Sequence, residues 1–144
     1  MTALLQLVDP KPRSGLLDRC VKKTEAFHSR MRHYVEMGSH IKPIRPEYLA
    51  ATLSALADDD ALFFADTGTA IIWAARLIEY GPNRRLFGSF SWASMANASP
   101  HAFGAQTAFP GRQTIALCGD GGFTMLALGD LLTEVERQAQ VVHV

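Results

Sequence analysis

The sequence has little of several features that mark common functional classes. It holds only two cysteines in 144 residues, Cys20 and Cys118, which lie far apart and outside any CxxC pattern. Their number and spacing argue against a disulfide framework and against a cysteine-based zinc site. We find no signal-peptide pattern and no apolar run of the roughly 20 residues that a membrane-spanning helix needs. A reducing, cytoplasmic environment is therefore expected.

Charge of one sign is lacking as well. Fourteen basic and fourteen acidic side chains give a formal net charge of zero, and no run of like charge occurs. A surface that binds nucleic acid or an anionic membrane needs a basic excess, which releases counterions when it meets phosphates. Nucleic acid is therefore not expected as a partner.

The apolar residues, in contrast, are numerous and strongly patterned. They make up 48% of the chain, enough for one modest domain with a core. Apolar side chains at spacings of three and four predict a helix over 14–37 with one apolar stripe. Residues 38–46 hold a glycine and two prolines without periodicity and are interpreted as a linker.

After the linker, short apolar strands alternate with helical segments. Strands are predicted over 61–65, 86–90, 114–118 and 140–144. Helices are predicted over 47–57, 70–79, 96–107 and 123–137. This alternation is typical of an α/β fold with a doubly wound parallel sheet. The last strand ends the chain in mid-pattern, so we expect an incomplete domain.

The sharpest motif is Cys118–Phe123, which follows an apolar strand and opens a helix. Glycines at such a turn let the backbone approach a ligand, and a helix N-terminus offers free N–H groups to phosphate. Asp120 adds a hard anionic oxygen of the kind that Mg²⁺ prefers. The motif matches neither a P-loop nor a dinucleotide fingerprint, and its plain alternative is an ordinary Gly-Asp-Gly turn.

Two other turns, 65–69 and 88–98, follow strands and consist mainly of small residues. If the three strands are neighbours, all three turns meet at one crevice, which favours ligand binding. The five histidines show no metal-ligand spacing, and Ser94 lacks the glycines of a nucleophile elbow. Trp73 and Trp92 are expected to serve in packing.

Several segments together resemble bacterial pyruvate oxidase, the quinone-dependent pyruvate dehydrogenase family of thiamine diphosphate enzymes. The segments are Ala65–Thr69, Trp73–Arg76, Arg84–Phe90, Ser94–Ala98, Gly104–Gln106 and Cys118–Phe123. The most discriminating is Ser94–Ala98, because the whole superfamily shares Gly-Asp-Gly. The resemblance implies that 43–144 are the first part of a diphosphate-binding domain. It identifies 1–42, more loosely, as the end of a central domain plus a linker.

The resemblance also implies roles for individual residues. Asp120 corresponds to the Mg²⁺ ligand, and Gly121 and Gly122 to backbone contacts with the diphosphate. The other implied cofactor neighbours are Gly68 and Thr69 near the phosphates, and Ala93, Ser94 and Met95 beside the rings, with Met95 supporting their bent conformation. No residue is assigned a catalytic role.

Two departures from the family pattern affect the implied site. The family has His-Gly where this chain has Trp92 and Ala93, which weakens the expected contact at Ala93. An Asn-Asn pair that supplies a second Mg²⁺ ligand is expected just past Val144. Cofactor binding by these 144 residues alone is therefore expected to be weak or absent.

The chemistry that the resemblance implies is oxidative decarboxylation of pyruvate to acetate or acetyl phosphate. Electrons pass through FAD to ubiquinone or another quinone, or to oxygen, although no flavin-site residue is found in this chain. A homo-oligomer, a dimer or tetramer, is implied, because an activating glutamate comes from a partner subunit. A peripheral contact with the inner membrane is implied only through a C-terminal region absent here.

Two alternatives stay open. The first is a truncated remnant without catalysis. The second is a different 2-keto acid enzyme, such as an acetolactate synthase or a decarboxylase, against which Ser94–Ala98 argues.

Overall fold

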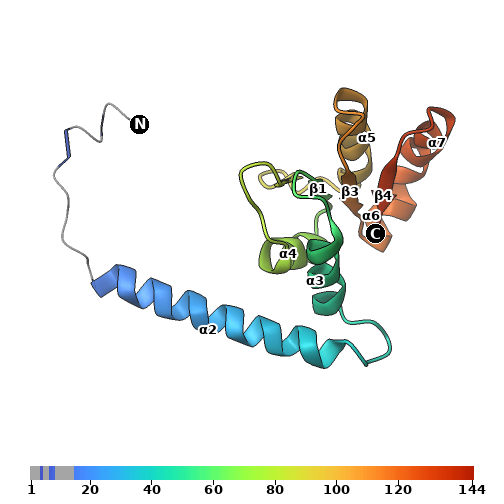
Figure 1. The fold of residues 1–144 in the computed structure, drawn as a ribbon. Helices are drawn as coiled ribbons and strands as arrows, with labels where there is room; N and C mark the ends of the chain where they lie inside the picture. Colours follow the sequence, from blue (N-terminus) through green and yellow to red (C-terminus); the bar gives the residue numbers. More distant parts are fainter. Residues whose placement is uncertain (1–3, 5–6, 9–14) are drawn as a thin grey trace.

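The computed structural model describes residue 4, residues 7–8 and residues 15–144. A long helix, α2 (Gly15–Gly38), leads into an α/β unit in which strands and helices alternate (Figure 1). The strands are β1 (Leu62–Ala65), β2 (Arg85–Gly88), β3 (Thr114–Leu117) and β4 (Val141–His143). The helices are α3 (Pro46–Leu56), α4 (Thr69–Leu77), α5 (Ala98–Ala108), α6 (Asp120–Gly122), the π-helix η1 (Phe123–Ala127) and α7 (Leu128–Glu136).

The described strands form one parallel sheet in the order β2-β1-β3-β4. The chain thus starts in the interior of the sheet, runs outward to β2, and then crosses back to β3 on the other side of β1. This reversal makes the boundary between β1 and β3 the switch point of the sheet. Ligands of such folds bind in the crevice outside the carboxyl ends of the strands at that point. The predicted α/β class with a parallel sheet is confirmed.

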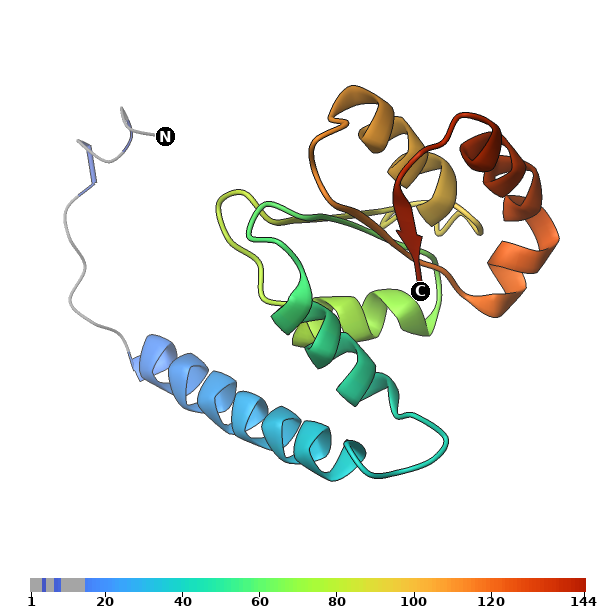
Figure 2. The same ribbon diagram turned by 45° about the vertical axis from the view of Figure 1, so that its right-hand side comes forward.

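Two apolar layers fix the helices to the sheet. On one face, α3 and α4 pack over a cluster that contains Phe63, Ala74 and Ile115. On the other face, α5 packs over Leu62, Phe64 and other small or apolar side chains. Figures 1 and 2 show α3 and α4 on one side of the sheet, and α5 and α7 on the other. The two central strands are buried at every residue, and apart from Thr114 they consist of apolar residues.

Helix α2 is confirmed where it was predicted and ends at Gly38, but its apolar stripe is largely exposed. Only Met31 and Gly38 of this helix are buried. Gly38 lies so close to α3 that a Cβ there would meet the Tyr48 Cβ at 3.1 Å. The domain boundary after residue 42 stays a prediction, and residues 1–3, 5–6 and 9–14 lie outside the described residues. Within the described part, no helix combines the length and apolarity that a bilayer span requires.

The helix predicted over 123–137 differs from the observed one in its start and its winding. The helical run begins at Asp120 and contains the π-helical segment η1 before α7. Buried positions within it are Gly122, Ala127 and Glu134. The first two are five residues apart, as one π turn requires, whereas an α-helix repeats its face every three or four residues. The π segment therefore lets Gly122, just before it, and Ala127, at its end, both face the interior of the protein.

Candidate functional site

The turns after β1, β2 and β3 meet at the carboxyl edge of the sheet. The Thr67 hydroxyl donates to the Ser94 carbonyl oxygen at 3.1 Å, which joins the β1 turn to the β2 turn. The Ser94 hydroxyl lies 3.1 Å from that of Ser89 within the β2 turn. The predicted convergence of these turns follows from the strand order, because β1 lies between β2 and β3.

Asp66 connects the β1 turn to the start of α5. Its side chain is only 2% exposed, and Oδ1 accepts hydrogen bonds from Asn97 Nδ2 at 3.1 Å and from the Ala98 backbone N–H at 3.2 Å. The Asn97 amide also donates to the Ser94 carbonyl oxygen at 2.9 Å. Asp66 Oδ2 and Asn97 Oδ1 are buried without a hydrogen-bond partner among the described residues. The role of Asp66 was not predicted, although an acidic side chain directly after a buried strand was a cue to it.

The β3 turn reaches the same junction through Gly122. A Cβ at this residue would lie 2.9 Å from Asp66 Oδ2 and 3.0 Å from the Ala96 backbone nitrogen. At Gly121 the same construction meets nothing within 4 Å. The two adjacent glycines therefore differ in kind: Gly122 allows close packing of the turns, whereas Gly121 borders open space.

This difference predicts that replacement by alanine has a large effect on stability at Gly122 and a small one at Gly121. Gly122→Ala should lower the free energy of unfolding by about 2 kcal/mol, because a buried carboxylate and a backbone segment must both shift. Gly121→Ala should change it by no more than about 0.5 kcal/mol, since alanine suits a helix and has room there. Urea unfolding followed by circular dichroism measures both. Equal effects at the two glycines would contradict this view of the junction.

A cavity of about 460 Å³ opens at this edge, beside the switch point. It is bordered by α3, by the turn and first residues of α4, by Met95, and by the end of β3 with the turn that follows. Six of the eight residues predicted beside a cofactor line it: Gly68, Thr69, Met95, Asp120, Gly121 and Gly122. The structure thus brings these residues together from three separate turns.

Two helices begin at this cavity with free backbone donors. The N-cap residue of α4 is Gly68, whose φ is +119°, and that of α6 is Gly119; no side chain caps either helix start. The first N–H groups of a helix have no partner within it, and the helix dipole adds partial positive charge there. Both starts therefore offer hydrogen-bond donors to an anionic group in one cavity.

The remaining predicted residues, Ala93 and Ser94, do not line the cavity. Ser94 is engaged in the hydrogen bonds between the turns, and Ala93 has a φ of +52°. A left-handed backbone costs a non-glycine residue about 1–2 kcal/mol, so the glycine of the family pattern would suit this position better. The prediction that Trp92 packs is wrong for the described chain, because this side chain is 89% exposed. Trp73 is half-buried and borders the cavity.

Comparison with known protein families matches residues 66–144 to the C-terminal thiamine pyrophosphate-binding domain of thiamine pyrophosphate enzymes. The chain belongs to this family. The matched segment starts at Asp66 and includes every turn that borders the cavity from the sheet edge. Thiamine pyrophosphate is thiamine diphosphate under its older name, so the predicted superfamily is confirmed.

Curated relatives agree on the family but differ in activity. YdaP of Bacillus subtilis, whose name assigns it to the thiamine pyrophosphate-containing proteins, is 37% identical over 71% of this chain. An acetolactate synthase of Mycobacterium bovis is 39% identical over 57%, and a pyruvate oxidase of Lactiplantibacillus plantarum is 30% identical over 71%. The chain spans only 18, 13 and 17% of the lengths of these three proteins.

The donor set of the cavity fits the diphosphate of a thiamine pyrophosphate enzyme better than it fits an isolated metal ion. The two helix starts supply N–H donors, and Asp120 supplies one exposed carboxylate at the first helical position. In the part of the chain that the structure describes, no three His, Cys, Asp or Glu side chains gather closely enough to hold a metal. The metal-ligand role of Asp120 stays a prediction.

Cys118 borders the cavity and carries a thiol that resists ionisation. Burial, and secondarily the carboxylates of Asp66 and Glu134, raise the pKa of this thiol to about 12. Because the thiolate is the nucleophile, we expect iodoacetamide at pH 8 to alkylate the exposed Cys20 at least about 100-fold faster than Cys118. Below the raised pKa, the Cys118 rate should climb about tenfold per pH unit. Peptide mass spectrometry follows both rates, and rapid labelling of Cys118 at pH 7 would contradict the assignment.

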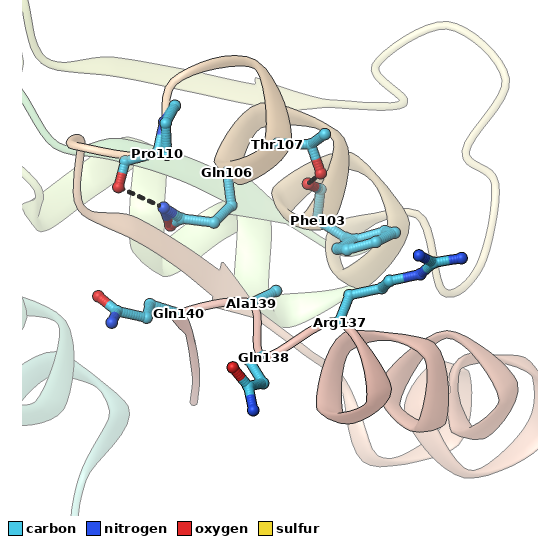
Figure 3. A pocket seen from close by; sticks show the side chains of 8 residues that line it. All are labelled: Phe103, Gln106, Thr107, Pro110, Arg137, Gln138, Ala139 and Gln140. Carbon is cyan, nitrogen blue, oxygen red and sulfur yellow. Dashed lines mark hydrogen bonds between the residues drawn. The ribbon is translucent and has the colours of Figure 1, made fainter.

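A second cavity, of about 570 Å³, lies at the opposite end of the sheet, before β3 and β4 begin. Figure 3 shows that its longer polar side chains, Arg137, Gln138 and Gln140, extend in different directions. The Gln106 amide is already used, since it donates to the Pro110 carbonyl oxygen at 2.9 Å. The polar side chains of this cavity do not converge, so the cavity is a suitable reference surface for binding experiments.

Proposed function

We propose that this chain forms the diphosphate side of a thiamine diphosphate site in an enzyme that oxidatively decarboxylates pyruvate. The observation that carries the proposal is the cavity at the switch point, where two uncapped helix starts and the Asp120 carboxylate face one space. The first N–H groups of α4 and of α6 would bind the diphosphate oxygens, and Asp120 would hold Mg²⁺. When bound, the cofactor supplies the electron sink that decarboxylation of a 2-keto acid requires.

The choice of pyruvate oxidation over acetolactate synthesis rests on two observations. The segment Ser94–Ala98 has the form that the pyruvate oxidase resemblance requires, and the likeness to a pyruvate oxidase extends over 71% of the chain. The likeness to acetolactate synthases is closer in identity but shorter, at 57% of the chain. Assay of the whole enzyme with pyruvate separates the two: acetate or acetyl phosphate with reduction of a quinone or oxygen supports oxidation, and acetolactate overturns it.

Further parts of the proposal concern the whole protein. FAD carries the electrons and binds outside this chain, and two subunits complete each cofactor site. The protein acts in the cytoplasm, on or near the inner membrane when a quinone accepts the electrons.

Cofactor binding by this chain can be tested directly by nuclear magnetic resonance. Titration of the ¹⁵N-labelled protein with thiamine diphosphate and MgCl₂ should give weak, saturable shifts at the amides of Gly68, Thr69, Gly121 and Gly122. Thiamine without the diphosphate should leave these amides unmoved. No shift up to the solubility limit, or shifts confined to the reference cavity around Gln138, would overturn the proposal.

A further inference from the structure

Four side chains from four elements form a hydrogen-bonded series behind the Gly-Asp-Gly turn. Glu134 on α7 is 3% exposed, and its Oε1 accepts from the Ser99 hydroxyl at 2.7 Å. Its Oε2 lies 2.6 Å from His143 Nε2 on β4. The other ring nitrogen, His143 Nδ1, lies 3.7 Å from Cys118 Sγ at the end of β3. Glu134 is thus a buried carboxylate with both oxygens engaged.

The Glu134 carboxylate sets the direction of its own two hydrogen bonds. An ionised carboxylate only accepts, so Ser99 and His143 Nε2–H both donate to Glu134. The other ring nitrogen, Nδ1, lies 3.7 Å from the Cys118 sulfur, whose thiol also donates to the Ala116 carbonyl oxygen at 3.8 Å. The series therefore links Cys118, His143, Glu134 and Ser99.

The hydrogen-bonded series reaches the edge of the cavity at Cys118. Cys118 immediately precedes Gly119 and Asp120 and borders the cavity. Its backbone N–H donates to the Val144 carbonyl oxygen at 2.8 Å, and the Val144 N–H donates to Ala116 at 2.9 Å. Backbone pairing therefore holds the end of β3 against the end of β4, and the side-chain series links this point to α7.

Glu134, further along the series, lies on the helical run that starts at Asp120. The π segment Phe123–Ala127 lies between Asp120 and Glu134 and changes the phase of the helix. With it, Asp120 is exposed at the cavity while Glu134 is buried against α5 and β4. The series therefore contacts this helical run at Glu134, and it contacts the chain just before the run at Cys118.

We propose that Glu134 is a positioning residue for the cofactor turn: through His143 it holds Cys118, and so keeps Gly119–Gly122 in the geometry that binds the diphosphate. This proposal rests on the proposed function of the cavity. Partners that orient a ligand-binding group from behind affect affinity by about 10- to 100-fold when they are removed. Neither Glu134 nor His143 lines the cavity, so any effect on binding must pass through the turn.

The test compares two glutamates on one helix. Glu134→Gln should raise the apparent Kd for thiamine diphosphate with Mg²⁺ about tenfold in the titration described above. Glu136→Gln removes the same charge from an exposed position two residues away and should leave the Kd unchanged. The ¹⁵N shifts of the His143 ring add a readout of the link itself, since the Nε2–H tautomer should lose its preference only in Glu134→Gln.

The outcomes separate this proposal from the proposed function. If the unaltered protein shows no localised shifts, the cavity is not a cofactor site. If it binds and Glu134→Gln binds equally well, Glu134 does not position the turn. Should Glu134→Gln fail to fold, Cys118→Ala interrupts the same series with a smaller change and should weaken binding in the same direction. In folded variants, the double substitution should weaken binding less than the two single effects combined, and strict additivity would overturn a route through Cys118.

Discussion

Replacing Asp66 with alanine is expected to lower the free energy of unfolding by about 3 kcal/mol. The carboxylate is 2% exposed and accepts hydrogen bonds from Asn97 and from the Ala98 backbone N–H. Ala98 is fully buried, so its N–H has no access to water once the acceptor is gone. An unsatisfied buried donor costs about 1–3 kcal/mol, and hydrogen bonds to a charged group are the stronger ones. Urea unfolding should show a lower midpoint with an unchanged slope.

The matched control for this prediction is Asp60→Ala. Asp60 is half exposed and its carboxylate lies 3.6 Å from the Arg112 side chain. A solvent-exposed ion pair contributes little, so we expect a loss of no more than about 0.5 kcal/mol. Similar losses for Asp60→Ala and Asp66→Ala would show that Asp66 does not hold the turns together.

Replacing Asp120 with alanine is expected to abolish the Mg²⁺ dependence of cofactor binding while leaving the fold intact. In the unaltered protein, Mg²⁺ should strengthen thiamine diphosphate binding at least about tenfold, because a hard carboxylate oxygen and the diphosphate share the ion. In Asp120→Ala, titrations with and without Mg²⁺ should coincide. The side chain is exposed and no side chain caps this helix start, so stability should fall by no more than about 1 kcal/mol.

Asp59→Ala is the control for this second prediction. Asp59 is exposed and precedes β1, so it lies at the end of the sheet away from the cavity. Its removal changes the net charge equally but leaves the cavity as it is. Retention of the Mg²⁺ effect in Asp59→Ala and its loss in Asp120→Ala would separate a local ligand from a general charge effect. Retention in both would overturn the metal assignment.

The positions of the strands and helices could be predicted because each depends on local pattern. The runs that became β1 and β3 are apolar except at Thr114, as is typical of strands covered on both faces. Glycine and small residues after each strand indicated the turns, and the motif at Asp120 indicated a phosphate-binding helix start. These signals lie within a few residues of each other, so the sequence alone carries them.

The π segment and the burial of Glu134 could not be predicted in this way. Periodicity expects buried positions three or four residues apart, whereas Gly122 and Ala127 are separated by five. A glutamate in an apolar helix also reads as solvent-exposed, because its partners His143 and Ser99 lie 9 and 35 residues away in sequence. Only packing of α7 against α5 and β4 brings these partners together.

The sequence by itself therefore determined the α/β class, the turns and six residues that come to border one cavity. The tertiary structure decided the strand order, and with it the switch point between β1 and β3 at which that cavity lies. It also decided which of two adjacent glycines is required for packing and which buried carboxylates hold the turns. The physical reason is that local pattern records whether a residue is buried, whereas the neighbour it is buried against is set by contacts between distant segments.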